Sequence, residues 1–163
     1  MRAGAVAFLR KPFSAVQMLK VLSSTLDMKE IENTISLIEN YTECWKQFHH
    51  YLQLVRAKRF EREDESQFLE LKSVLAQQFE LVLAAVEYKY PTREEVHKLL
   101  TESPSLKYLT EMDTDSIRMA EARWHKIYIG LQSILGQLKV QQQAKQKPIG
   151  AGAGWSFFRR ASA

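Results

Sequence analysis

Cysteine, proline and glycine are scarce in this sequence. It has six glycines and four prolines, and so few helix breakers favour long helices over a sheet-rich fold. The single cysteine, Cys44, excludes an intramolecular disulfide and fits a reducing compartment. No apolar run approaches the roughly 20 residues that a membrane-spanning helix needs. We therefore expect a cytoplasmic protein, with one helical domain plus tails and enough residues for a core.

Acidic residues are absent from both ends of the chain. All 19 of them lie between Asp27 and Glu121. Residues 1–26 carry four basic residues and residues 147–163 carry three, so the 23 basic residues leave the middle of the chain slightly acidic. The net charge of +4 thus belongs to the ends. A folded body of this charge lacks the basic face of a nucleic-acid-binding protein, and we expect no nucleic-acid partner.

Apolar residues recur every three or four positions along residues 28–60, which predicts one long helix. The steps place them on a single stripe: Ile31, Ile35, Ile38, Tyr41, Trp45, Phe48, Leu52 and Val55. Asp27, with Glu30 three residues later, has the pattern of a capping box and predicts where this helix begins. Other helices must cover a stripe that is so long and so aromatic.

The rest of the chain supplies those helices. Residues 63–88 carry a wide apolar stripe, which predicts a central helix, and the short connection makes it antiparallel to the first. Thr92 and Glu95 form a capping box that opens a short helix through Leu100. Ser103-Pro104 predicts one more turn at residues 105–109.

A last long helix begins at Thr110 with Asp113. Its apolar residues form a strict heptad seam over three repeats: Ile117, Ala120, Trp124, Ile127, Leu131, Ile134 and Leu138. Gly130 and Gly136 in this helix are interpreted as sites where a neighbouring helix approaches closely. Trp45 and Trp124 are expected to be buried between the long helices.

These patterns predict an all-α fold. It is an antiparallel helical bundle of three long helices plus one or two short helices, with a non-core N-terminal arm. The expected organisation is residues 1–26 as the arm, residues 27–146 as the bundle, and residues 147–163 as a tail.

The arm resembles part of a known family. Gly4-Ala5, Phe8-Leu9 and Lys11-Pro12-Phe13, followed by a one-sided helix after Ser14, resemble the carboxyl end of a bacterial response-regulator receiver domain. In that family the segment is the fifth strand, the Lys-Pro turn and the fifth helix, and Lys11 matches the lysine that pairs with the phosphorylated aspartate. The four preceding strands and the acidic residues are absent, so no receiver activity is implied.

Three origins of this arm stay open from the sequence. The first is a truncated, decayed or wrongly started receiver domain, as the resemblance implies. The second is a plain basic arm. The third is a mitochondrial presequence, because the segment bears arginine and serine, has no acidic residue and is amphipathic.

No set of side chains in the sequence forms a catalytic, cofactor or metal site. Adjacent helical residues such as His49 and His50 point about 100° apart and do not present two ligands to one metal. Glu94 and His97 have the spacing of di-iron bundles, which need two such motifs and two further glutamates. Glu121 and His125 lack a third ligand. We therefore predict a non-enzymatic protein with no cofactor and no metal.

A histidine-phosphotransfer protein is the alternative, because that family is also built as a four-helix bundle with an exposed histidine. The candidates are His125-Lys126 and His49-His50. Bulky Trp124 and Tyr128 around His125 do not match that family's small residues. Cys44, beside Trp45, is interpreted as a structural thiol.

The favoured function is an interaction or assembly module, linked to bacterial two-component signalling through the receiver-like residues Lys11 and Pro12. A protein partner is expected, and a second copy of the same chain is one candidate for that partner. A Gly/Ala linker at residues 149–154 leads to an aromatic and basic tip that suits a partner groove or an anionic membrane surface: Trp155, Phe157, Phe158, Arg159 and Arg160.

Overall fold

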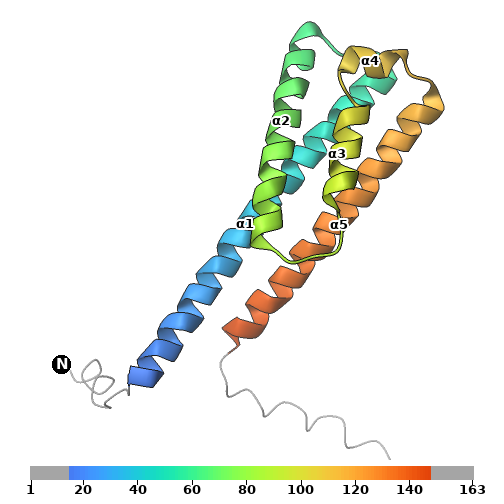
Figure 1. The fold of residues 1–163 in the computed structure, drawn as a ribbon. Coiled ribbons are helices and arrows are strands. Elements are labelled where there is room, and N and C mark those ends of the chain that lie inside the picture. The colour runs from blue at the N-terminus through green and yellow to red at the C-terminus, as the bar shows by residue number, and fades with distance from the viewer. Residues whose placement is uncertain (1–14, 148–163) are drawn as a thin grey trace, which may run out of the picture.

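The computed structural model describes residues 15–147, and every regular element in that range is an α-helix. The helices are α1 (Ala15–Ala57), α2 (Arg62–Ala85), α3 (Arg93–Glu102), α4 (Leu106–Glu111) and α5 (Thr114–Gln146). α1, α2, α3 and α5 run alternately up and down, and α4 lies at the end where α5 begins (Figure 1). Because α3 contacts both α2 and α5, the short helix completes a four-helix arrangement. The predicted all-α antiparallel bundle is confirmed.

α1 is one uninterrupted helix of 43 residues, so the predicted boundary and cap at Asp27 are wrong. The helix contains neither proline nor glycine to stop it. The apparent boundary is instead a change of apolar face, because the step from Leu26 to Ile31 is five residues. Leu22 and Leu26 stand nine residues, or about two and a half turns, before Ile31 and Ile35. The two apolar stripes therefore lie on opposite sides of α1.

α2 ends at Ala85, earlier than the predicted Tyr88. Val86 is already extended, with φ −139°, and the following residues turn back toward the bundle. Val86 and Tyr88 pack against the core, and Pro91 is buried. Burial of these side chains outweighs the extra helical hydrogen bonds that another turn of α2 would make.

Three further helix starts were predicted, at Thr92, Ser103 and Thr110; the first is confirmed and the other two require correction. Thr92 caps α3 as predicted, its Oγ1 accepting from the Glu95 N–H. Ser105, not Ser103, caps α4 by accepting from the Tyr108 N–H. Thr110 belongs to α4, and Asp113 alone caps α5, with 2.6 Å between its Oδ1 and the Ser116 N.

The central helix is α1 rather than α2. α1 packs against α2, α4 and α5, and its stripe forms the middle of the core. α2 faces only α1 and the small helices α3 and α4, so Val74 and Leu81 on its wide stripe stay exposed. Trp45 is completely buried, as predicted, whereas Trp124 is only partly buried at the α1–α5 boundary.

The two glycines of α5 differ in their surroundings. A Cβ atom added at Gly130 would lie 2.7 Å from Cδ1 of Tyr90 and 3.2 Å from Cδ of Pro91. A Cβ atom at Gly136 would meet no atom within 4 Å. The predicted close approach therefore occurs only at Gly130, and the α2–α3 loop makes it rather than a helix.

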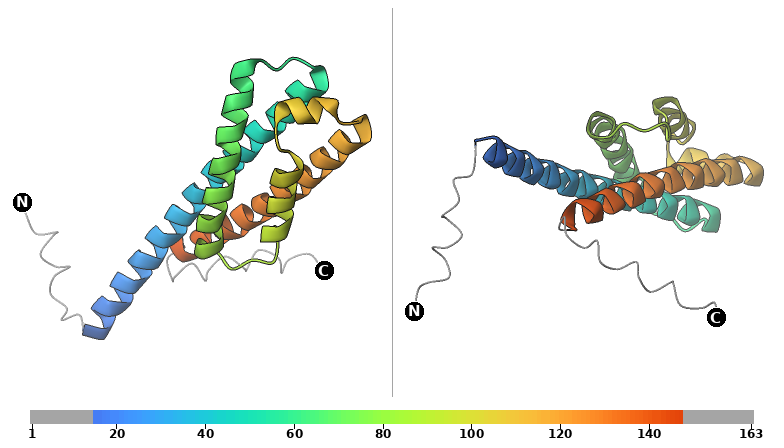
Figure 2. Two further views of the ribbon diagram at one scale, coloured as in Figure 1. Left: turned by 45° about the horizontal axis from the view of Figure 1, so that its top comes forward. Right: turned by 90° about the horizontal axis from the view of Figure 1, so that it is seen from below.

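The helices differ greatly in length, and this leaves one end of the molecule open. α2 has 24 residues and α3 has 10, against 43 in α1 and 33 in α5. Beyond the last turn of α2, α1 and α5 continue as a pair, and the first turns of α1 extend past α5 (Figures 1 and 2).

Candidate interaction surfaces

The first three turns of α1, residues 15–26, are called the arm from here on, and they carry a stripe of uncovered apolar side chains, the arm stripe. Leu19, Leu22 and Leu26 form its centre and are 65%, 58% and 62% exposed. Val16 and Met18 flank them and are exposed as well. The spacing of four and three residues puts the leucines on one side of the helix, opposite the core stripe. The arm stripe thus points away from the core of its own bundle.

The three hydroxyl side chains of the arm are satisfied within the helix. The hydroxyl of Ser23 donates to the Lys20 carbonyl, and those of Ser24 and Thr25 donate to the Val21 carbonyl, at 2.9–3.0 Å. These bonds tie the short polar side chains to the backbone of their own helix. The large side chains of this segment that still face water are therefore mainly apolar.

The interacting residues that the sequence predicts lie elsewhere. Lys11, Pro12 and the tip residues (Trp155, Phe157, Phe158, Arg159 and Arg160) lie outside the described residues. For the residues of the arm stripe the sequence predicts only a separate one-sided helix. The five-residue step after Leu26 was the available signal, because within one continuous helix it can only mean that the apolar face changes side.

A groove adjoins the arm, at the open end where α2 has stopped. It has a volume of about 710 Å³ and lies between α1 and α5. Ile31, Val86, Ile134 and Leu138 provide its apolar lining. Its charged lining is acidic on balance, with Asp27, Glu30 and Glu87 against a single lysine, Lys145.

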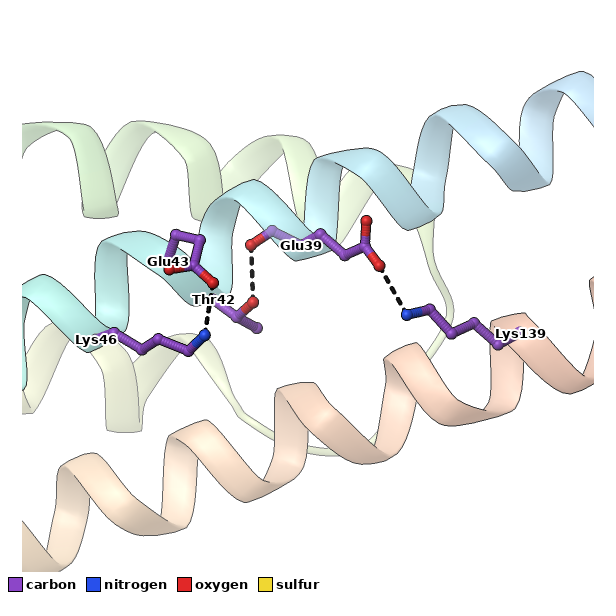
Figure 3. Close-up of polar contacts among 5 residues, drawn as sticks. All are labelled: Glu39, Thr42, Glu43, Lys46 and Lys139. Atoms are coloured by element: carbon purple, nitrogen blue, oxygen red, sulfur yellow. Dashed lines mark hydrogen bonds and ion pairs between the residues drawn. The ribbon is translucent and has the colours of Figure 1, made fainter.

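Ion pairs connect α1 to α5 beside this groove. Glu39 on α1 reaches across to Lys139 on α5 at 2.7 Å, while Glu43 and Lys46 pair within α1 (Figure 3). Lys145 pairs with Asp27 at 3.6 Å nearer the arm. Exposed pairs of this kind contribute about 0–1 kcal/mol each. Apolar packing therefore decides the stability of this end, and the ion pairs mainly select the relative position of the two helices.

The four histidines do not converge. His49 is half-buried on α1, whereas His50, His97 and His125 are exposed on α1, α3 and α5. Within residues 15–147, no group of three or more His, Cys, Asp or Glu side chains could hold a metal ion. Bulky rings surround the predicted His125 site, since Trp124 stacks on Tyr128 with centroids 5.2 Å apart.

His49 belongs to an aromatic stack across α1 and α5. Its ring lies parallel to that of Trp124, at 3.9 Å between centroids and 10° between planes. Trp124 in turn donates its Nε1–H to the Trp45 carbonyl at 2.7 Å. Burial lowers the pKa of His49; nearby Glu121 opposes this effect, and His125 and His50 reinforce it.

The lowered pKa of His49 predicts a loss of stability in mild acid. In the unfolded chain the imidazole takes up a proton near pH 6.5, about the ordinary value for histidine. In the folded state it stays neutral to a lower pH, because its pKa is lowered. Stability contributed by His49 is therefore complete above pH 6.5 and falls as the pH drops toward the folded pKa. We expect the unfolding free energy of the wild type to decrease more than that of His49→Gln between about pH 7.5 and pH 5.5, measured by urea titration. Equal decreases would contradict this role.

Cys44 has the surroundings of a structural thiol, and two of the three cations that line the small cavity beside α3 are paired. Burial raises the pKa of the Cys44 thiol, whose Sγ lies 3.9 Å from Oε1 of Gln78, which is typical of a structural cysteine. The cavity, of about 270 Å³, is lined by Lys126 and Arg123 among other residues. These two cations already pair with Glu95 and Glu102, so no unpaired positive charge from them faces a ligand.

Comparison with known proteins finds no relative of this chain. The chain matches no family model, no curated protein and no solved structure. Within the described range, no helix is both long and apolar enough to cross a membrane.

Proposed function

We propose that the protein is a non-enzymatic interaction and assembly module that docks through the arm stripe. One observation carries this proposal: Leu19, Leu22 and Leu26 are each more than half exposed on a helix that is continuous with the bundle core. Contiguous apolar surface of this kind, in a soluble protein, marks a docking surface. An amphipathic helix with anchors at three- and four-residue spacing is also a common recognition element.

The receiver-like sequence supports a partner in bacterial two-component signalling. The residues that resemble the fifth helix of a receiver domain are the same residues that form the arm. A segment that resembles part of a signalling domain, on a helix continuous with the bundle, is well placed to contact other components of such a pathway.

The proposal is tested by site-specific photocrosslinking in the cells that produce the protein. A photoreactive phenylalanine at Leu22 is expected to give one or a few adducts of discrete mass, whose components mass spectrometry identifies. The same group at Met119, which is equally exposed on α5, is the matched control. Equal adducts at both positions, or none at Leu22, would contradict a docking role for the arm.

The bundle is expected to fold without the arm, which separates a docking role from a structural one. Of the side chains in residues 15–26, every one is exposed, so their loss removes little from the core. A chain lacking residues 1–26 should keep a cooperative thermal transition, followed by circular dichroism, while losing the adducts. If the transition disappears, the arm is part of the folding unit.

Phosphotransfer is the second candidate function. It is favoured by the antiparallel arrangement of α1, α2, α3 and α5 and by the exposed imidazoles of His50, His97 and His125. The test is acid-labile phosphate on the chain after incubation with a phosphodonor kinase, and its loss in one His→Gln variant. Absence of such phosphate would leave the interaction module as the remaining function.

A further inference from the structure

We infer that the occupant of the open groove is the arm of a second copy of this chain. The two copies form a symmetric dimer in which each arm lies in the groove between α1 and α5 of the other. This inference rests on the proposed function and names the partner of the same surface. Three observations on the described residues, with the charge of the sequence, carry it.

The groove and the arm lie at the same end of the molecule and are placed for exchange. The groove lies where α2 has ended, so the α1–α5 pair there lacks the further helix that completes the bundle elsewhere. The arm is a helix that projects past that same end (Figure 2). An arm from a second copy would take the position that α2 occupies farther up. Two arms and two α5 helices would then form an intermolecular bundle of four.

The charges of the two surfaces are opposite. Residues 1–26 contain four basic residues and no acidic one, and Lys20 lies within the arm itself. The groove presents Asp27, Glu30 and Glu87 against Lys145, which already pairs with Asp27. Lys20, the one charged residue in residues 15–26, therefore meets a groove that is acidic on balance. In contrast, pairing of two arms alone would place one basic segment beside another.

The area is sufficient for a stable dimer. Burying an aliphatic side chain removes on the order of 100 Å² from water, and the five side chains of the arm stripe are each about 60% exposed. Two arms and the groove surfaces that they cover come to roughly 1,200 Å², at the lower end of the range for stable specific complexes. Two arms packed only on each other would bury about half of that, which is too little.

The first test is the oligomeric mass of the full chain. Sedimentation velocity over a range of micromolar concentrations is expected to show a species of twice the 18.9 kDa chain mass. Leu19→Glu with Leu22→Glu should raise the dimer dissociation constant by about 100-fold or more, because charges would be placed in the centre of the interface. Val21→Glu is the matched control, since Val21 is 60% exposed on the other side of the same arm, and it should leave the dissociation constant unchanged.

The second test distinguishes an arm in a groove from an arm on an arm. Glu30→Lys with Glu87→Lys reverses the groove charge and should also weaken the dimer, whereas Glu94→Lys, on α3 outside the groove, should not. Mixing the arm variant with the groove variant should restore dimers. One of the two contacts in such a mixed dimer pairs an unchanged arm with an unchanged groove. Pairing of arms would give no restoration, because every mixed dimer would contain an altered arm.

The outcomes separate this inference from the proposed function. A chain that is monomeric at about 100 μM, or a mixture that does not restore dimers, overturns the inference. If a photoreactive group at Leu22 then gives adducts of other masses in cells, the docking role of the arm stands with another partner. Loss of the dimer on removal of residues 148–163, with no effect of the arm substitutions, would also overturn the inference, because the contact would belong to that segment.

Discussion

Replacing Trp45 by alanine is expected to lower the free energy of unfolding by about 3–5 kcal/mol, as is usual for a large aromatic removed from a core. The side chain of Trp45 is completely buried. Its ring meets those of Tyr41 and Phe48 at 6.0 Å and 5.5 Å between centroids. Phe48 continues to Phe68 on α2, and the cavity would therefore open at the contact between α1 and α2.

Urea unfolding followed by circular dichroism measures this loss, with Met119→Ala as the control. Met119 is exposed on α5, and its truncation should change stability by less than about 0.5 kcal/mol. Trp124→Ala should cost less than Trp45→Ala, because Trp124 is partly buried, but it also removes the hydrogen bond to the Trp45 carbonyl. A loss below about 1 kcal/mol at Trp45 would be incompatible with a core centred on α1.

Alanine at the two glycines of α5 is expected to change stability in opposite directions. Gly130→Ala should destabilise the protein by about 1–3 kcal/mol, because the new methyl group would overlap the Tyr90 ring and crowd Pro91. Gly136→Ala should stabilise it by up to about 1 kcal/mol, since alanine is the better helix former and the position is open.

This pair of variants tests the α2–α3 loop directly. Both substitutions are the same chemical change in the same helix, so the difference in their unfolding free energies isolates the contact with Tyr90. Tyr90→Ala combined with Gly130→Ala should recover part of the loss, since the overlap with the Tyr90 ring would be gone while the contact with Pro91 stays. If Gly130→Ala stabilises the chain as much as Gly136→Ala, the loop does not pack on α5.

The sequence by itself determined the helices and most of their inward faces. The three- and four-residue steps from Ile35 to Val55 identify the buried stripe of α1, because helical periodicity is a local property of the chain. The cap at Thr92 could likewise be predicted, since it needs only a side chain and a backbone N–H three residues away. The short link after α1 also fixed the antiparallel course of α2.

The tertiary structure decided which apolar faces are covered. Periodicity shows that Leu19, Leu22 and Leu26 share a side of a helix, but not that this helix continues unbroken through Asp27. Because α1 is continuous, the arm stripe faces away from the core. It stays uncovered because the neighbouring helices are too short to reach it. The same comparison of lengths, 24 residues in α2 against 43 in α1, opens the groove beside it. Coverage depends on contacts between distant parts of the chain, which a local pattern does not contain.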